Sequence, residues 1–264
     1  MPDTLVESFE KNGYLIFKDN SNVVNKLRSN IISILKKKNN KLKSKTDDFV
    51  INNFHKFYSK KNLNEIRYKL YNNINLIKGF GDLYYKCSKK ILDRLIGNEV
   101  AIQKKINLSI QMPNDPDSLL DMHSDIYAGE SPFQVVVWIP MVDVKGTKSM
   151  FFTTPKTNKR LNNLVLNSKK KTVREIYQKN KKKFKFLNLK FGEILIFSPL
   201  ILHGNTINRT KETRFSLNCR FKSLLSPYDV IVKSHRNIPQ FYRPLNIKPM
   251  TKIGFKYLMK YEKN

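Results

Sequence analysis

Histidine and aspartate, two residue types that bind metal ions, lie close together at one point of this chain. The chain has only four histidines, so a site built from two of them has few candidates: His55, His123, His203 and His235. His123 and Asp125 are two residues apart, and on an extended backbone residues with this spacing point to the same face. This spacing lets an imidazole and a carboxylate reach one metal ion.

A second imidazole, from a distant segment, would complete a metal-binding set. His203 directly follows a strongly apolar run from Phe191 to Leu202, so a polar ring closes an otherwise apolar strand and loop. Two imidazoles and one carboxylate on one face of an octahedron leave the other positions open for a co-substrate and dioxygen, as in non-haem iron(II) oxygenases. An HxD pair alone often arises by chance, and an isolated histidine is more often structural. Together, His123, Asp125 and His203 predict an iron(II) site.

A guanidinium and a hydroxyl lie downstream on one face of an expected strand. Arg214 and Ser216 belong to the polar positions of the alternating run from Arg214 to Phe221. A guanidinium binds a carboxylate through two parallel hydrogen bonds, so this face suits a carboxylate co-substrate. Gln111 and Asn107, on the expected strand before the HxD pair, are placed to reach into the barrel toward a carboxylate co-substrate, although a cross-strand hydrogen bond explains each of them equally well.

The elements that position these residues fall into two regions. Short β-prone runs separated by turn residues follow Val100, and they predict strands over 106–111, 133–142, 149–154, 194–197 and 214–221. The first third predicts a short strand over 13–17 and amphipathic helices over 23–35, 63–74 and 83–95, the last ended by Gly97. We therefore expect a mainly β fold with flanking helices, and a jelly-roll (double-stranded β-helix) core whose interior holds the polar site.

The chain is long enough for one large domain and contains no linker that would divide it. We expect one domain over 1–264, with a mostly helical buttress at 1–99, the core at 100–222 and a C-terminal extension at 223–264. A basic insertion at 156–190 carries Lys169–Lys171 and Lys181–Lys183, with a short helix through Val173 and Ile176. The insertion is either a lid that attracts an anionic substrate or a solvated loop of a lysine-rich protein.

The net charge of +29 suggests a polyanionic partner, but its distribution argues against one. The lysines are spread along the whole chain, and no nucleic-acid-binding motif accompanies them, so nucleic acid is the less favoured partner. No apolar run is long enough to cross a bilayer and the first residues do not resemble a secretion signal, so we expect a cytoplasmic protein. Cys87 and Cys219 lack metal-site spacing and are expected to be buried thiols.

The chain resembles the Fe(II)/2-oxoglutarate oxygenase superfamily, in particular its phytanoyl-CoA dioxygenase-like branch, over most of Phe9 to Phe221. The resemblance rests on the opening Phe9-Glu10-Lys11-Asn12-Gly13-Tyr14, on His123-Ser124-Asp125, on His203-Gly204 and on Arg214-Phe215-Ser216. The block from His123 to Asp143 is similar to oxygenases found in sporadic bacterial carbohydrate-biosynthesis clusters. One departure is Thr154-Pro155-Lys156-Thr157, where the family usually has Pro-Gly-Ser-His.

The resemblance implies an Fe(II)- and 2-oxoglutarate-dependent dioxygenase that uses O2. It implies that His123, Asp125 and His203 hold iron, that Arg214 pairs with the distal carboxylate of 2-oxoglutarate, and that Ser216 adds a hydrogen bond. The leading hypothesis is hydroxylation of a small molecule, such as a sugar or a phosphorylated metabolite. Two alternatives stay open: the same chemistry on a nucleic acid or protein, and a non-catalytic jelly-roll binding module.

Overall fold

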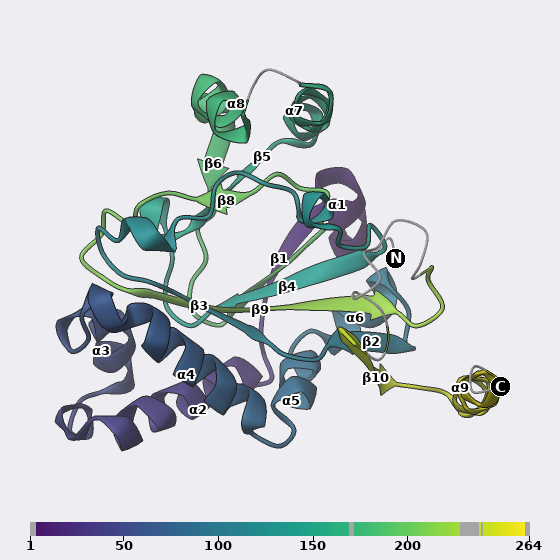
Figure 1. Cartoon of the computed structure of the whole chain (residues 1–264), viewed down its shortest axis with the longest axis horizontal. Coiled ribbons are helices and arrows are strands. Elements are labelled where there is room, and N and C mark those ends of the chain that lie inside the picture. The colour runs from purple at the N-terminus through teal and green to yellow at the C-terminus, as the bar shows by residue number, and fades with distance from the viewer. Residues whose placement is uncertain (1–3, 169–171, 228–237, 239, 262–264) are drawn as a thin grey trace.

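The computed structural model describes residues 4–168, 172–227, 238 and 240–261, and within these residues the strands form two antiparallel sheets (Figure 1). The larger sheet has the order β1-β7-β4-β9-β2-β10, and β3 also pairs with β9. Its strands are β1 (Tyr14–Lys18), β2 (Val100–Gln103), β3 (Asn107–Gln111), β4 (Gln134–Pro140), β7 (Glu193–Phe197), β9 (Arg214–Ser223) and β10 (Tyr242–Asn246). The smaller sheet contains β5 (Met150–Thr153), β6 (Phe184–Phe186) and β8 (Gly204–Asn205). This arrangement confirms the expected jelly-roll class with flanking helices.

The long strand β9 separates the apolar core from the polar interior. Its apolar positions face the helices: the ring of Phe215 packs edge-on against Phe54 at 5.1 Å, and that of Phe221 stacks on Tyr84 at 6.3 Å. Because side chains alternate along a strand, the polar positions of β9 project to the opposite face. Arg214 is among the residues there that line a pocket, as the alternating sequence predicted.

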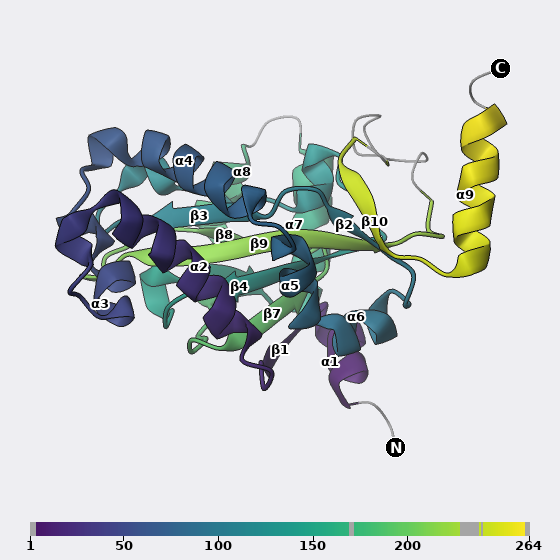
Figure 2. The ribbon, with the colours of Figure 1, turned by 90° about the horizontal axis from the view of Figure 1, so that it is seen from below.

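Helices α2 (Val23–Lys38), α4 (Leu63–Leu76) and α5 (Phe80–Lys86) cover one face of the larger sheet (Figure 2). The N-terminus of α2 is fixed by Asp19, whose Oδ2 accepts a hydrogen bond from the amide of Val24 at 2.8 Å. The apolar stripe of α2 is then fully buried, since Leu27, Ile31 and Leu35 are at most 1% exposed. The amphipathic helices predicted over 23–35 and 63–74 are therefore confirmed.

The helix predicted over 83–95 is two helices, α5 and α6 (Lys89–Leu95). The break falls at Cys87 and Ser88, both buried, whose side chains donate to the carbonyls of Tyr84 and Tyr85. Such bonds from side chain to backbone compete with helical hydrogen bonding and favour an interruption. Gly97 follows α6 with a φ of 85°, as expected of a residue that ends a helix.

The basic insertion folds into two helices, α7 (Pro155–Asn167) and α8 (Val173–Asn180), followed by a short 3-10 turn over 181–183. Only the second helix was predicted. The local signal for α7 is a capping threonine followed by proline: Thr154 accepts a hydrogen bond from the amide of Thr157, and Pro155 occupies the first turn. Lys169–Lys171, part of the predicted lid, lie outside the described residues.

The remaining helices are α1 (Thr4–Asn12), α3 (Asp47–Asn52) and α9 (Pro249–Tyr261). The last of these stands apart from the sheets at the C-terminal end (Figures 1 and 2). Both cysteines are free and buried, as expected. Among the helices of the described ranges, none combines the length and apolarity needed to span a bilayer.

Candidate metal and co-substrate site

His123 and His203 are brought together by their backbones. Each donates its amide hydrogen to the carbonyl of the other at 2.9 Å, which forms an isolated antiparallel bridge, and their rings lie 4.3 Å apart between centroids. Asp125 is held beside them because its amide donates to the carbonyl of Pro199 at 3.0 Å. Ser124, between the two predicted ligands, fixes the same contact by donating from its hydroxyl to Pro199 at 2.7 Å.

The three side chains converge as a metal site requires. Oδ1 of Asp125 lies 3.5 Å from Nε2 of His123 and 3.7 Å from Nε2 of His203. Each residue offers one ligand atom, and these atoms all lie within 4.8 Å of one another. Within the described part of the chain, no other group of histidine, cysteine and acidic residues meets this criterion. The predicted set is therefore assembled at one point.

The hydrogen bonds of the two imidazoles leave the correct nitrogens free to bind a metal. Nδ1 of His123 lies 2.8 Å from the carbonyl of Asp121, and Nδ1 of His203 lies 2.8 Å from that of Ile201. A carbonyl only accepts, so each Nδ1 carries the proton and each Nε2 presents a lone pair toward Asp125. Backbone contacts of this kind fix the tautomer and orientation of metal-binding imidazoles.

The protonation states also suit a cation. Burial lowers the pKa of His203 to about 4, so this imidazole is neutral at neutral pH. Burial alone would raise the pKa of Asp125, but its neighbours His123, Arg220 and His203 outweigh that effect and hold it well below its usual value. Two imidazoles and one ionised carboxylate form the donor set of a non-haem iron(II) centre.

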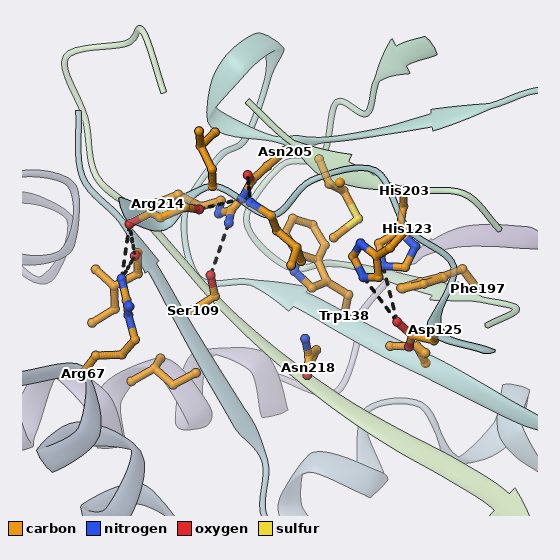
Figure 3. Close-up of a pocket in the computed structure, with 18 of the residues that line it drawn as sticks. Arg67, Ser109, His123, Asp125, Trp138, Phe197, His203, Asn205, Arg214 and Asn218 are labelled. Carbon is orange, nitrogen blue, oxygen red and sulfur yellow. Dashed lines mark hydrogen bonds and ion pairs between the residues drawn. The ribbon is translucent and has the colours of Figure 1, made fainter. Parts of the chain in front are cut away.

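Arg214 lies at the other end of the same pocket, with Trp138 between it and the predicted metal ligands (Figure 3). Its guanidinium donates from Nη2 to the hydroxyl of Ser109 at 3.2 Å, while its Nε and Nη1 are buried without a hydrogen-bond partner. Burial, together with the positive charge of Arg67, lowers the pKa of Arg214 to about 10, so it stays charged. Unpaired buried N–H groups on a cation are costly, and a carboxylate would satisfy them.

The pocket between the predicted metal ligands and Arg214 has a volume of about 300 Å³. Its walls come from both sheets and from the segment after β3, and the residues named so far are joined by Met150, Phe197, Asn205, Asn218, Asp117 and Ser118. Trp138 is buried in this wall, with 2% of its surface exposed. The residues present thus fit a metal at one end of the cavity and one carboxylate of a small dicarboxylate at the other.

Two predicted co-substrate residues lie outside this lining. Gln111 is fully buried and donates its side-chain amide to the carbonyl of Thr206 at 2.7 Å, so it serves a neighbouring loop. Ser216 is also buried. It pairs with Ser109 of β3, which lines the pocket, but Ser216 itself is not among the lining residues. The cross-strand alternative holds for Asn107, whose amide donates to Asn218 at 2.9 Å.

His55 is not among the residues that line the pocket. Nδ1 of His55 lies 2.9 Å from the hydroxyl of Thr213, a contact between an N-terminal segment and the start of β9. His55 therefore has a structural contact away from the predicted metal ligands. His235 lies outside the described residues.

Two arginines at the pocket were not predicted as parts of the site. Arg67, from α4, donates to the carbonyl of Ile110 at 2.9 Å and to the hydroxyl of Ser118 at 3.2 Å. Arg220 lies on the same face of β9 as Arg214, and it forms an ion pair with Asp125 itself, at 3.0 Å. The alternation of side chains along β9 could have predicted that Arg220 faces the pocket. Arg67 is one of many basic residues on helices, and no sequence pattern indicated its place at the pocket.

The insertion packs behind the two histidines. Leu161 of α7 and Ile176 of α8 form a small buried cluster with Met122 and Leu202, the residues that directly precede His123 and His203. Asn158 of α7 adds a hydrogen bond that its Oδ1 accepts from the amide of Leu202 at 2.8 Å. In Figure 1, α7 and α8 lie on the side of the smaller sheet that faces away from the larger one. The described part of the insertion thus supports the histidine bridge from outside.

Comparisons with known proteins identify a matching family and several structures that share the fold. The family model "Phytanoyl-CoA dioxygenase (PhyH)" matches residues 9–216. A comparison with curated proteins found no match. Among solved structures, the non-heme monooxygenase ThoJ in its nickel complex is 12% identical with a TM-score of 0.54, and the alignment covers 98% of this chain and 97% of that one.

Two further solved structures share the fold at a similarly low sequence identity. SnoK, described as a non-heme alpha ketoglutarate dependent carbocyclase from nogalamycin biosynthesis, is 12% identical with a TM-score of 0.56, over 94% of this chain and 95% of that one. HygX from Streptomyces hygroscopicus, with nickel and 2-oxoglutarate bound, is 10% identical with a TM-score of 0.51, over 85% of this chain and 88% of that one.

Proposed function

The chain belongs to the phytanoyl-CoA dioxygenase family and is an Fe(II)- and 2-oxoglutarate-dependent dioxygenase, and we propose that it hydroxylates a small molecule in the cytoplasm. We propose a sugar, or a phosphorylated metabolite of carbohydrate biosynthesis, as the substrate class. The observation that carries the proposal is one pocket with a His-Asp-His group at one end and a buried, incompletely paired guanidinium at the other.

We assign the iron to His123, Asp125 and His203. Together, iron, 2-oxoglutarate and dioxygen supply the oxidising power: the co-substrate is decarboxylated to succinate, and one oxygen atom is transferred to a substrate carbon. The protein's own task is to hold the two Nε2 atoms and one carboxylate oxygen on one side of the ion. Their backbone hydrogen bonds orient them before any ligand arrives, so little reorganisation accompanies binding.

We assign the distal carboxylate of 2-oxoglutarate to Arg214. Nε and Nη1 of this guanidinium are buried without a partner, and a charged carboxylate would accept hydrogen bonds from such donors. Trp138 lies between the two ends of the pocket and limits the room for water beside the bound dicarboxylate (Figure 3). Ser216 and Gln111 remain proposed co-substrate residues, which would act from behind the lining.

The remaining lining supports a small polar substrate. The cavity of about 300 Å³ lies at the lower end of the range for small-molecule sites, and it must also hold the co-substrate. Amide, hydroxyl and carboxylate groups of Asn205, Asn218, Ser118 and Asp117 lie at its surface. Such groups both donate and accept hydrogen bonds, which matches the hydroxyl groups of a sugar.

The test is a substrate screen that measures succinate release with iron, 2-oxoglutarate and air. We expect succinate formation above the uncoupled rate with one or more sugars or sugar phosphates, with a product heavier by one oxygen atom. His203→Ala should abolish both signals. Stimulation by peptides or nucleic acid, with none by small polar molecules, would contradict the proposed substrate class and favour a macromolecular substrate.

A further inference from the structure

Arg220 contacts the predicted metal ligand Asp125 on the oxygen that points away from the histidines. Its Nη2 donates to Oδ2 of Asp125 at 3.0 Å. The other oxygen, Oδ1, is the one that faces Nε2 of His123 and of His203, at 3.5 and 3.7 Å. The two oxygens of this carboxylate therefore have different partners, one on the metal side and one on the arginine side.

The guanidinium of Arg220 is itself fixed in place by two buried residues. Its Nη1 donates to Oε1 of Gln103 on β2 at 3.2 Å, and its Nε forms an ion pair with Oε1 of Glu130 at 3.4 Å. Gln103 and Glu130 are 5% and 2% exposed. A guanidinium held from three sides has little freedom to rotate, so its donor to Asp125 has a defined direction.

Glu130 also accounts for the charge balance around the site. A guanidinium beside a divalent cation would weaken cation binding through like-charge repulsion. The carboxylate of Glu130 contacts Nε of Arg220, whereas Asp125 contacts Nη2, and Glu130 is not among the residues that converge on the predicted metal position. It therefore offsets part of the charge of Arg220 without competing for the metal.

We propose that Arg220 is a positioning residue that makes Asp125 bind the metal through Oδ1 alone. A carboxylate that used both oxygens would occupy a further coordination position, one that a chelating co-substrate or dioxygen needs. The charge-assisted hydrogen bond from Arg220 engages the lone pairs of Oδ2 and keeps that position open. This inference rests on the proposed metal ligands, and its test separates the two claims.

The test uses Arg220→Leu, Arg220→Lys and the matched control Arg214→Leu, which removes another arginine from the same face of the same strand. Mn²⁺ replaces iron, and the exchangeable water ligands are counted by electron paramagnetic resonance in ¹⁷O-enriched water, without co-substrate. We expect fewer water ligands in Arg220→Leu than in the wild type. Arg220→Lys, which retains a charged donor, and Arg214→Leu should keep the wild-type number.

A second measurement links the coordination change to the co-substrate. In anaerobic titrations of the iron-loaded protein, Arg220→Leu should weaken 2-oxoglutarate chelation by roughly 10-fold or more, the usual range for removing a group that orients a metal ligand. Arg214→Leu should also weaken chelation, because it removes a partner of the co-substrate. Only Arg220→Leu should combine weaker chelation with a changed number of water ligands.

An unchanged number of water ligands in folded Arg220→Leu would overturn the inference. Asp125→Ala separates this failure from failure of the ligand assignment, because retention of Mn²⁺ by that variant would mean that Asp125 is not a ligand at all. Where Arg220→Leu fails to fold because Glu130 loses its ion pair, Arg220→Leu/Glu130→Gln removes both charges and carries the same expectation. Thermal melting monitored by circular dichroism establishes which variants are folded.

Discussion

At the scale of single residues, the pocket separates the tasks of its charged groups. His123, His203 and Asp125 are oriented toward one point by backbone contacts, and Arg220 holds the far oxygen of the carboxylate. Arg214 is directed elsewhere, toward the opposite end of the cavity (Figure 3). Removal of Arg220 should therefore change how the metal is coordinated, whereas removal of Arg214 should change how 2-oxoglutarate binds.

Arg214→Leu is predicted to impair 2-oxoglutarate binding without impairing metal binding. Each hydrogen bond to a charged group contributes roughly 1.5–3 kcal/mol, so loss of a two-point contact should raise the Kd for 2-oxoglutarate by about 100-fold or more. The measurement is an anaerobic titration of the iron-loaded protein followed by the visible charge-transfer band. Arg214→Lys keeps the positive charge but loses the planar guanidinium, so its Kd should lie between those of the wild type and Arg214→Leu. A Kd equal to that of the wild type in Arg214→Leu would remove this residue from the co-substrate site.

Residue-level prediction from the sequence worked where the residue type is scarce. The chain has only four histidines, so the spacing of His123 and Asp125 and the context of His203 were informative. Lysine and arginine together number 50, so the sequence does not distinguish one basic residue on a helix from the others. The presence of Arg67 at the pocket could therefore not be predicted. Its position depends on how α4 packs against β3, which is a tertiary property.

At the scale of elements, the histidine bridge depends on the helices behind it. Asn158 of α7 accepts a hydrogen bond from the amide of Leu202 and donates one to the carbonyl of Leu200 at 3.1 Å. Both contacts hold the segment that leads into His203. The insertion thus supports the site through packing and hydrogen bonds, in addition to any role of its lysines toward a substrate.

Asn158→Ala is predicted to weaken iron binding while leaving the protein folded. Loss of the two contacts removes about 1–3 kcal/mol of local stability and lets the segment before His203 move. We expect the Kd for Fe²⁺ to rise by roughly 10-fold, as for other groups that orient metal ligands. The measurement is an anaerobic metal titration. Asn163→Ala, on an exposed position of the same helix, is the matched control and should bind iron like the wild type. Equal affinities in the two variants would contradict a supporting role for α7.

The elements that were predicted are those whose pattern repeats within one segment. β3 and β9 alternate apolar and polar residues because one face of each is buried and the other lines the interior. β2 is buried at all four positions and so shows no alternation, while β6 and β8 are too short for a pattern. These strands are specified by pairing with distant partners, which a single segment does not reveal.

At the scale of the whole molecule, the net charge of +29 is not concentrated at the pocket. The described lining contains three arginines, and each has a local task or contact there: Arg67, Arg214 and Arg220. The remaining positive charge is spread over the chain. Binding of this chain to polyanions is therefore expected to be electrostatic and independent of the reaction.

We predict that duplex DNA binds weakly and that binding falls steeply as salt is raised, since such affinity comes from counterion release. DNA should leave the rate of succinate release unchanged. Fluorescence anisotropy at several salt concentrations measures the first point, and a succinate assay with and without DNA measures the second. DNA that accelerates succinate release at physiological salt would contradict a small-molecule substrate.

The convergence of His123, Asp125 and His203 on one ion is the central claim, and an anaerobic titration with Fe²⁺ and 2-oxoglutarate tests it most directly. The wild type should develop the visible charge-transfer band of a chelated co-substrate, and Asp125→Ala and His203→Ala should not. His55→Ala, which changes a histidine bonded to Thr213, should retain the band. A band of wild-type intensity in Asp125→Ala or His203→Ala would contradict the account.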